Sequence, residues 1–224
     1  MDARRRQIKI VLRCRLYLGE TPAAATDTFL PTWIPARPSG KTVAIIGSGP
    51  AGLFGALRLQ EKGIRCVIIE RGAPVSQRKV DIARISREGL VDGNSNYCFG
   101  EGGAGCFSDG KLYTRSDKRG NLAQVLRIFH HFGADPSILT AAHPHIGTDR
   151  LPAVIDAMRQ KMEELGSSFL FNTRCTDFII EEKDGQKRVR GIRATDARTG
   201  QEQEIRCDAV LLASGHSAAD IYGM

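Results

Sequence analysis

Two apolar runs on either side of a helix-like segment form the clearest pattern in the sequence. Residues 42–46 and 66–69 are apolar almost throughout, which is typical of strands buried on both faces of a parallel sheet. Between them, Pro50 suits the first position of a helix and Gly63 suits its C-terminal cap. The pattern predicts a β-α-β unit with its helix at residues 50–62.

The middle of the chain has weaker periodicity. Residues 71–120 are rich in glycine and largely irregular. We expect helices near residues 80–88 and 121–132, and a longer one at about residues 151–165, where apolar side chains recur on one helical face. These segments separate the β-α-β unit from the strands that follow.

Strand patterns dominate the last third of the sequence. Residues 168–172 and the apolar residues 209–213 each predict one strand. Three more strands, joined by short turns that contain glycine, are predicted at residues 176–182, 189–195 and 203–207. We interpret these three as an antiparallel meander.

The N-terminal segment has a different character. Apolar and polar side chains alternate within residues 8–18, which predicts an edge strand. Residues 20–40 contain several prolines and read as extended connecting chain. The first residues are basic and lack a continuous apolar stretch, so we expect no signal peptide.

Composition narrows the class of protein. The chain has 224 residues, of which 42% are hydrophobic and 25% charged, as in ordinary globular proteins. No apolar run approaches the length of a membrane span. The net charge of +7 comes from scattered basic residues, so we expect no nucleic-acid partner. The six cysteines form no C-x-x-C pair and fit no zinc pattern, which predicts reduced thiols, no metal and a cytoplasmic location.

The strongest local signal is a glycine-rich loop between the first strand and its helix. The loop reads Gly47, Ser48, Gly49, Pro50, Ala51 and Gly52. Glycine at 47 allows a sharp turn, glycine at 49 lets a pyrophosphate approach the backbone, and glycine at 52 lets helix and strand pack closely. The helix N-terminus then offers free N–H groups and a positive dipole end to phosphates. The loop therefore predicts a dinucleotide site.

An acidic residue follows at the place that such a site requires. Glu70 ends the second strand, where a carboxylate can accept hydrogen bonds from both hydroxyls of an adenosine ribose. The same negative charge argues against a ribose 2′-phosphate at this position. We include the adjacent Arg71 among the candidate cofactor-binding residues.

The order of the later elements distinguishes between dinucleotides. In a simple NAD domain a third strand follows promptly, whereas here about a hundred residues intervene. The meander, and a closing strand that ends in Ala213, Ser214 and Gly215, resemble the FAD domain of the glutathione-reductase-like flavoprotein superfamily, in which Thr is usual where this chain has Ser214. The resemblance implies that the backbone of Cys175 meets the adenine.

A second glycine-rich segment, residues 99–112, narrows the resemblance. Together with residues 145–149 and 213–222, it resembles a bacterial family of FAD-dependent dehydrogenases among the NAD(P)/FAD-dependent oxidoreductases, and the likeness extends over the chain. Its glycines let backbone approach a ligand, and its polar side chains can contact pyrophosphate or ribitol. The candidates in this segment are Gly102, Gly103, Ser108 and Lys111.

These features predict an α/β fold, a Rossmann-like FAD/NAD(P)-binding domain with a parallel sheet and an antiparallel three-stranded meander, incomplete at the C-terminus. We expect an N-terminal strand and proline-rich linker at residues 1–39, and the FAD-binding domain at residues 40–224 with an insertion at about 73–165. Members of the family continue into a substrate domain and return with a final strand and helix. We therefore expect the chain to be a truncated, N-terminal portion.

The resemblance implies a FAD-dependent oxidoreductase of unknown small-molecule substrate, with NAD(P)H as an electron donor. Two alternatives stay open: a dinucleotide-binding module without catalysis, and a flavin-dependent RNA-modifying enzyme. No residue is assigned as a catalytic acid or base, although His216, just past the closing strand, is a candidate to lie near the flavin. Cys98 and Cys106 lack the close spacing of a redox dithiol, whose sulfurs must be able to bond.

Overall fold

The computed structural model describes most of the chain after its N-terminal segment. The described residues are 16, 18–19, 29–38, 40–108, 110–112, 120–216 and 218–223. The chain divides into two compact units, Met1–Leu30 and Pro31–Met224, and the fold below is that of the second unit. The strand predicted at residues 8–18 falls largely outside the described residues.

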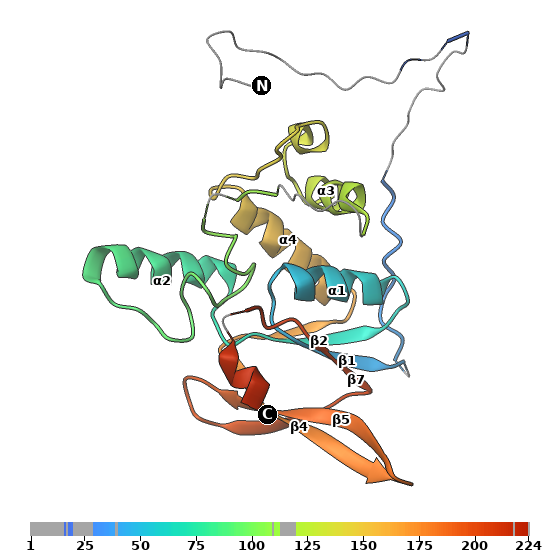
Figure 1. Cartoon of the computed structure of the whole chain (residues 1–224), viewed down its shortest axis with the longest axis vertical. Helices are drawn as coiled ribbons and strands as arrows, with labels where there is room; N and C mark the ends of the chain where they lie inside the picture. Colours follow the sequence, from blue (N-terminus) through green and yellow to red (C-terminus); the bar gives the residue numbers. More distant parts are fainter. Residues whose placement is uncertain are drawn as a thin grey trace. The chain divides into compact units, whose positions relative to one another are not determined.

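A parallel sheet forms the centre of this unit. Its strands are β1 (Thr42–Ile46), β2 (Arg65–Ile69), β3 (Ser168–Leu170) and β7 (Ala209–Leu212). They lie in the order β3-β2-β1-β7 (Figure 1). Ile46 of β1 is in register with Ile69 on one side and Leu212 on the other, so the carboxyl ends of three strands meet at one edge. Ligands bind at this edge in open α/β sheets.

Four α-helices are found among the described residues. They are α1 (Pro50–Gln60), α2 (Val75–Glu88), α3 (Leu122–His131) and α4 (Leu151–Glu164). Short 3-10 helices, η1 and η2, occur at Pro136–Leu139 and Ala219–Gly223. The helices α1, α3 and α4 agree with the predicted segments to within a few residues.

The helix α2 begins earlier than the sequence predicted. Its first turn starts at Val75 rather than near residue 80. The backbone N–H of Val75 donates to the buried carboxylate of Glu101 at 2.7 Å. This bond satisfies a donor that has no partner within the helix at its N-terminus. Because the capping residue is distant in the sequence, no local signal marks the start of the helix.

The three meander strands are present; the first two are longer than predicted, and the third has the predicted length but begins one residue earlier. They are β4 (Thr173–Lys183), β5 (Gln186–Asp196) and β6 (Glu202–Arg206), and they pair antiparallel in that order. Pairing continues up to Lys183 opposite Gln186, beside a turn in which Asp184 and Gly185 both have positive φ. Such a two-residue turn matches the twist of a hairpin, so the ladder extends to the ends of both strands.

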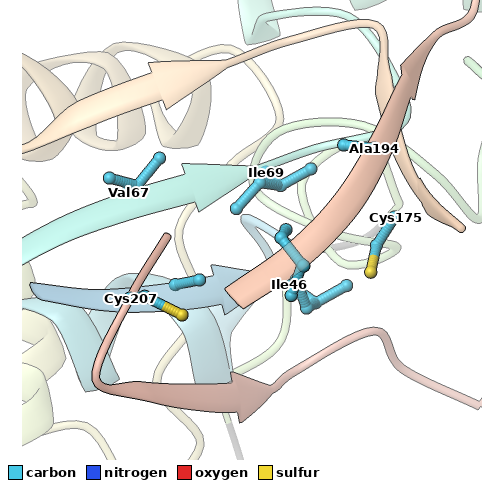
Figure 2. Packing of buried hydrophobic residues seen from close by; sticks show 8 residues of the cluster. Ile46, Val67, Ile69, Cys175, Ala194 and Cys207 are labelled. Carbon is cyan, nitrogen blue, oxygen red and sulfur yellow. The ribbon is translucent and has the colours of Figure 1, made fainter. Parts of the chain in front are cut away.

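An apolar core lies between the parallel sheet and the meander. Its buried residues are Ala44, Ile46, Val67, Ile69, Cys175, Ile192, Ala194 and Cys207 (Figure 2). Ile45 and Ile68 alternate with these residues and are also fully buried; they face the other side of the sheet, because successive side chains of a strand point in opposite directions. The helices α1 and α4 lie on that side (Figure 1). Burial of each large apolar side chain stabilises the fold by roughly 2 kcal/mol.

The segment before β1 contacts the C-terminal ends of α3 and α4. The backbone N–H of Ala36 donates to the carbonyl oxygen of Leu165 at 2.8 Å. The ring of Trp33 stacks on Phe132 with 5.2 Å between centroids. These contacts anchor the chain entering β1 at the C-terminal ends of α3 and α4. In the part of the chain that the structure describes, no helix is long and apolar enough to cross a membrane.

Candidate cofactor-binding site

A pocket of about 480 Å³ opens at the carboxyl edge of the parallel sheet. Its wall includes the first glycine loop (residues 47–52), the second glycine loop (residues 96–106), the start of β4 and the segments that follow β2 and β7. Most of the sequence-predicted binding residues line it: Gly47, Gly49, Pro50, Ala51, Glu70, Arg71, Gly103, Cys175, Ala213, Ser214 and Gly215. The fold therefore brings together candidates from distant parts of the sequence.

The glycines of the first glycine loop have two different roles. Gly47 has a φ of 106°, and a Cβ there would lie 2.5 Å from the carbonyl oxygen of Ala213. A Cβ on Gly52 would overlap the carbonyl oxygen of Gly47. At Gly49 the nearest atom to a Cβ would be the Cα of Gly103, at 3.8 Å, and the residue lines the pocket. Gly47 and Gly52 shape the loop, whereas Gly49 exposes bare backbone to the pocket.

Helix α1 presents its N-terminus to the pocket. Pro50 and Ala51, at the start of the helix, line the wall, and the first turn contains no acidic residue. The first N–H groups of a helix have no partners within the helix, and the aligned peptide dipoles place a partial positive charge there. This end of the pocket therefore favours an anion such as a pyrophosphate.

The carboxylate of Glu70 connects the two glycine loops. It is 5% exposed, and its Oε2 accepts hydrogen bonds from the backbone N–H and the hydroxyl of Ser48, both at 2.9 Å. Its Oε1 accepts from the backbone N–H groups of Gly72 at 2.9 Å and Gly100 at 3.1 Å. A carboxylate has about four acceptor sites, so all are used within the protein. A ribose hydroxyl that binds Glu70 must therefore replace the Ser48 hydroxyl, which can rotate to another staggered position.

Arg71 contributes a donor that finds no acceptor among the residues that the structure places. Its guanidinium lies 4.1 Å from the centroid of the Phe99 ring, donates to the side chain of Asn94 at 3.2 Å and pairs with Asp220 at 3.4 Å. Its Nε is buried and has no hydrogen-bond partner among the described residues. A buried donor without an acceptor destabilises a fold, and an acceptor on a bound ligand restores the bond. This donor and the bare backbone at Gly49 fit a bound dinucleotide.

The remaining predicted residues do not line the pocket. Ser48 and Gly52 lie behind the wall, and the backbone N–H of Gly102 donates to the carbonyl oxygen of Ser48 at 3.0 Å, which joins the two glycine loops. The Ser108 hydroxyl donates to a nearby carbonyl oxygen at 3.3 Å. Lys111 takes part in an isolated antiparallel bridge. Contact of Ser108 and Lys111 with a cofactor stays a prediction.

No disulfide links the cysteines that the structure describes. The cysteines within the described residues are all free: Cys66, Cys98, Cys106, Cys175 and Cys207. Burial raises the pKa of Cys106 and of Cys175 to about 11, so both are protonated at neutral pH and are poor nucleophiles. Among the residues that the structure places, no group of His, Cys, Asp and Glu is arranged to hold a metal ion.

Three charged residues that the sequence did not reveal support the second glycine loop. Arg78 and Glu101 are fully buried. Glu101 accepts from the Nε of Arg159 at 3.0 Å, and burial raises the pKa of Glu101 to about 7. One signal for Arg78 was available, because it lies with Val75 and Ile82 on the buried face of α2. An arginine within an apolar helical stripe needs buried acceptors.

Two family profiles match the chain, and each is described as a FAD binding domain. They cover residues 41–84 and residues 102–220, and the second match alone spans more than half of the chain. The chain belongs to the FAD binding domain family. The sequence resemblance to the superfamily of FAD-dependent oxidoreductases is thereby confirmed, as is the Rossmann-like fold with its meander.

Two longer proteins are similar to this chain. A protein of Clostridium beijerinckii, described as an uncharacterized protein, is 36% identical over 191 residues, which are 85% of this chain and 33% of that protein. The crystal structure of Thermovibrio ammonificans THI4 is similar with a TM-score of 0.51 and 18% identity, over 82% of this chain and 60% of that one. The second likeness shows the fold alone. The chain spans about one third of the length of the Clostridium relative.

Proposed function

We propose that the pocket holds the adenosine diphosphate half of FAD and that the chain is the FAD-binding portion of an oxidoreductase. One observation carries the proposal. The N-terminus of α1, the bare backbone at Gly49 and the wall residue Arg71 converge on the same pocket, and the Nε of Arg71 has no partner in the described part of the chain. Membership in the FAD binding domain family supports FAD as the dinucleotide.

In this proposal each part of the pocket wall contacts a different part of FAD. The pyrophosphate lies against Gly49 and the start of α1, where N–H groups and the helix dipole favour it. Glu70 and Arg71 hold the adenosine, the backbone of Cys175 meets the adenine, and the turn at residues 213–215 lies beside the remainder of the cofactor. FAD supplies the two-electron chemistry when bound, and the protein orients it and excludes competing reactions.

The test of cofactor binding is a titration of the purified chain with FAD. Quenching of flavin fluorescence and a shifted visible spectrum should saturate with added protein. A chain that stays colourless after mixing with FAD and gel filtration contradicts the proposal. Gly49→Val is the matched variant, because its side chain enters the space proposed for the pyrophosphate.

For a longer protein that contains this chain, we propose the activity of a FAD-dependent dehydrogenase that takes electrons from NAD(P)H. His216 lines the same pocket, and we propose that it lies near the flavin. Replacement of His216 by Ala should lower turnover in the longer protein, and unchanged turnover removes this residue from the proposal.

A second candidate function is a dinucleotide-binding module without catalysis. The span of the chain favours it, because one third of the Clostridium relative corresponds to this chain. Reduction of an artificial dye by NAD(P)H separates the two candidates. Dye reduction favours the oxidoreductase, and FAD binding without electron transfer favours the module.

A further inference from the structure

Arg78 is the largest completely buried side chain among the described residues. Its guanidinium donates to backbone carbonyl oxygens of the second glycine loop, at distances of 2.6 to 3.3 Å: those of Asn96, Tyr97, Gly100, Glu101 and Gly103. A guanidinium carries its N–H donors in a rigid planar fork. A single rigid group therefore binds five carbonyl oxygens along this loop.

The second glycine loop is shaped around Arg78 and packs on the first glycine loop. Gly100 has a φ of 120°, and a Cβ there would lie 2.5 Å from the Cδ of Arg78. Three residues further on, a Cβ on Gly103 would lie 2.9 Å from the Cδ of Pro50. The pocket wall at Gly103 therefore follows from the position of Arg78, although Arg78 does not line the pocket.

The burial of this charge favours a single loop conformation. Removing a guanidinium from water is strongly unfavourable unless hydrogen bonds replace its hydration. Arg78 obtains these bonds only while the carbonyl oxygens of the second glycine loop stay in place. Any other path of the loop leaves a buried charge without acceptors, so the alternatives are disfavoured.

We propose that Arg78 is a positioning residue for the cofactor, acting through the second glycine loop to set the pocket wall beside the pyrophosphate. The inference rests on the proposed FAD-binding function for its ligand. Its effect on the loop can be observed without any ligand, so the two proposals can fail separately.

Cys106 gives the ligand-free measurement. It is fully buried, and its backbone N–H donates to the carbonyl oxygen of Gly103 at 3.3 Å. Burial raises the pKa of the Cys106 thiol to about 11, and the charge of Arg78 partly offsets this rise, so losing that charge by itself slows alkylation. In Arg78→Met we expect iodoacetamide to label Cys106 at least about tenfold faster, through local opening. Mass spectrometry should find Cys66 and Cys175 still protected.

Three ligands of increasing length give the second measurement. In Arg78→Met, we expect binding of FAD and ADP to weaken about tenfold, because both place a pyrophosphate beside the displaced wall. AMP lacks the second phosphate and should lose less. The control is Arg84→Met on the same helix, whose side chain is 54% exposed and pairs with Glu88. This control should change neither thiol labelling nor ligand affinity.

If Cys106 stays protected in Arg78→Met and the affinity for FAD and ADP is unchanged, the proposal is overturned. An equal loss of affinity for FAD, ADP and AMP also overturns it. If Arg78→Met also exposes Cys66 and Cys175, Arg78→Lys decides, because it keeps the charge and loses the fork. Selective labelling of Cys106 in that variant supports the proposal, and simultaneous labelling of all buried thiols overturns it. A wild-type chain that binds none of the ligands removes the proposed function, and the labelling then decides on Arg78 alone.

Discussion

The two glycine loops meet at the pocket but are held in different ways. The first glycine loop is short, and it lies between β1 and α1, with Gly47 in a left-handed conformation and Pro50 at the first helical position. The second glycine loop contains no helix or strand. It is held by side chains from elsewhere, namely Arg78, Glu70 and Arg159 through Glu101.

This difference predicts how each loop should respond to a substitution or to a change of pH. The first glycine loop depends on backbone atoms in close contact, so an added methyl group disrupts it sterically. The second glycine loop depends on buried charges and their acceptors, so it responds to the loss of a hydrogen bond or to pH. Four substitutions test this contrast between the two loops.

Gly52→Ala should have the largest effect, because its Cβ would overlap the carbonyl oxygen of Gly47. We expect the free energy of unfolding to fall by about 3 kcal/mol and FAD affinity to fall about a hundredfold. Urea denaturation and a flavin fluorescence titration measure the two. The control in the other loop is Gly105→Ala, since a Cβ there has no atom within 4 Å. Equal effects of the two variants would rule out the steric account.

Glu70→Gln tests the side chain that touches both loops. The amide nitrogen of Gln cannot accept a hydrogen bond, so either the Ser48 donors or the donors of Gly72 and Gly100 lose their acceptor. We expect the free energy of unfolding to fall by about 2 kcal/mol. Urea denaturation measures it beside Glu88→Gln, an exposed control on α2. A loss no larger than in the control contradicts the bridging role.

The pH dependence of stability isolates the support of the second glycine loop. Burial raises the pKa of Glu101 from 4.5 to about 7, so the folded state holds this proton more tightly than the unfolded chain. The resulting stabilisation is complete below about pH 4.5 and is lost as the pH rises through about 7. Glu101→Gln cannot ionise, so the stability of the wild type relative to this variant should fall across that range. A pH-independent difference in urea denaturation rejects the assignment.

Ser48→Ala should have the smallest effect. It removes one of the four donors to Glu70 and keeps the backbone N–H, which lowers the free energy of unfolding by about 1 kcal/mol. If a ribose hydroxyl replaces the Ser48 hydroxyl at Glu70, FAD affinity should stay equal or rise. Denaturation and fluorescence titration are compared on the same preparation. A parallel loss of stability and affinity shows that the Ser48 hydroxyl binds the cofactor itself.

The sequence predicted the parts of the fold whose signals are local. The strands β1 and β2 are continuous apolar runs, and the first glycine loop joins β1 to a helix that starts at Pro50. These features depend on neighbours in the chain, so reading the sequence in order was sufficient. The predicted start of α2 was wrong because Glu101, which accepts the hydrogen bond of the first helical N–H group, lies far from that group in the sequence.

The candidate site was likewise predictable only where its signals are local. Glu70 and the turn at residues 213–215 end strands, and strand ends meet at the edge of a parallel sheet. Within the glycine-rich segment at residues 99–112, composition alone could not determine which residues face the pocket. Gly103 lines it, whereas Ser108 and Lys111 do not. The path of the second glycine loop depends on Arg78, whose burial is a property of the folded chain.

The central position of β1 has a consequence for the synthesis of the protein. β1 pairs with β2 soon after it in the sequence, but its other edge pairs with β7. A ribosome that adds about 5–20 residues per second completes β7 roughly ten to thirty seconds after β1. During that interval one edge of an apolar strand is unpaired, and such edges associate with other chains. We expect the nascent chain to depend on a chaperone until β7 has left the ribosome.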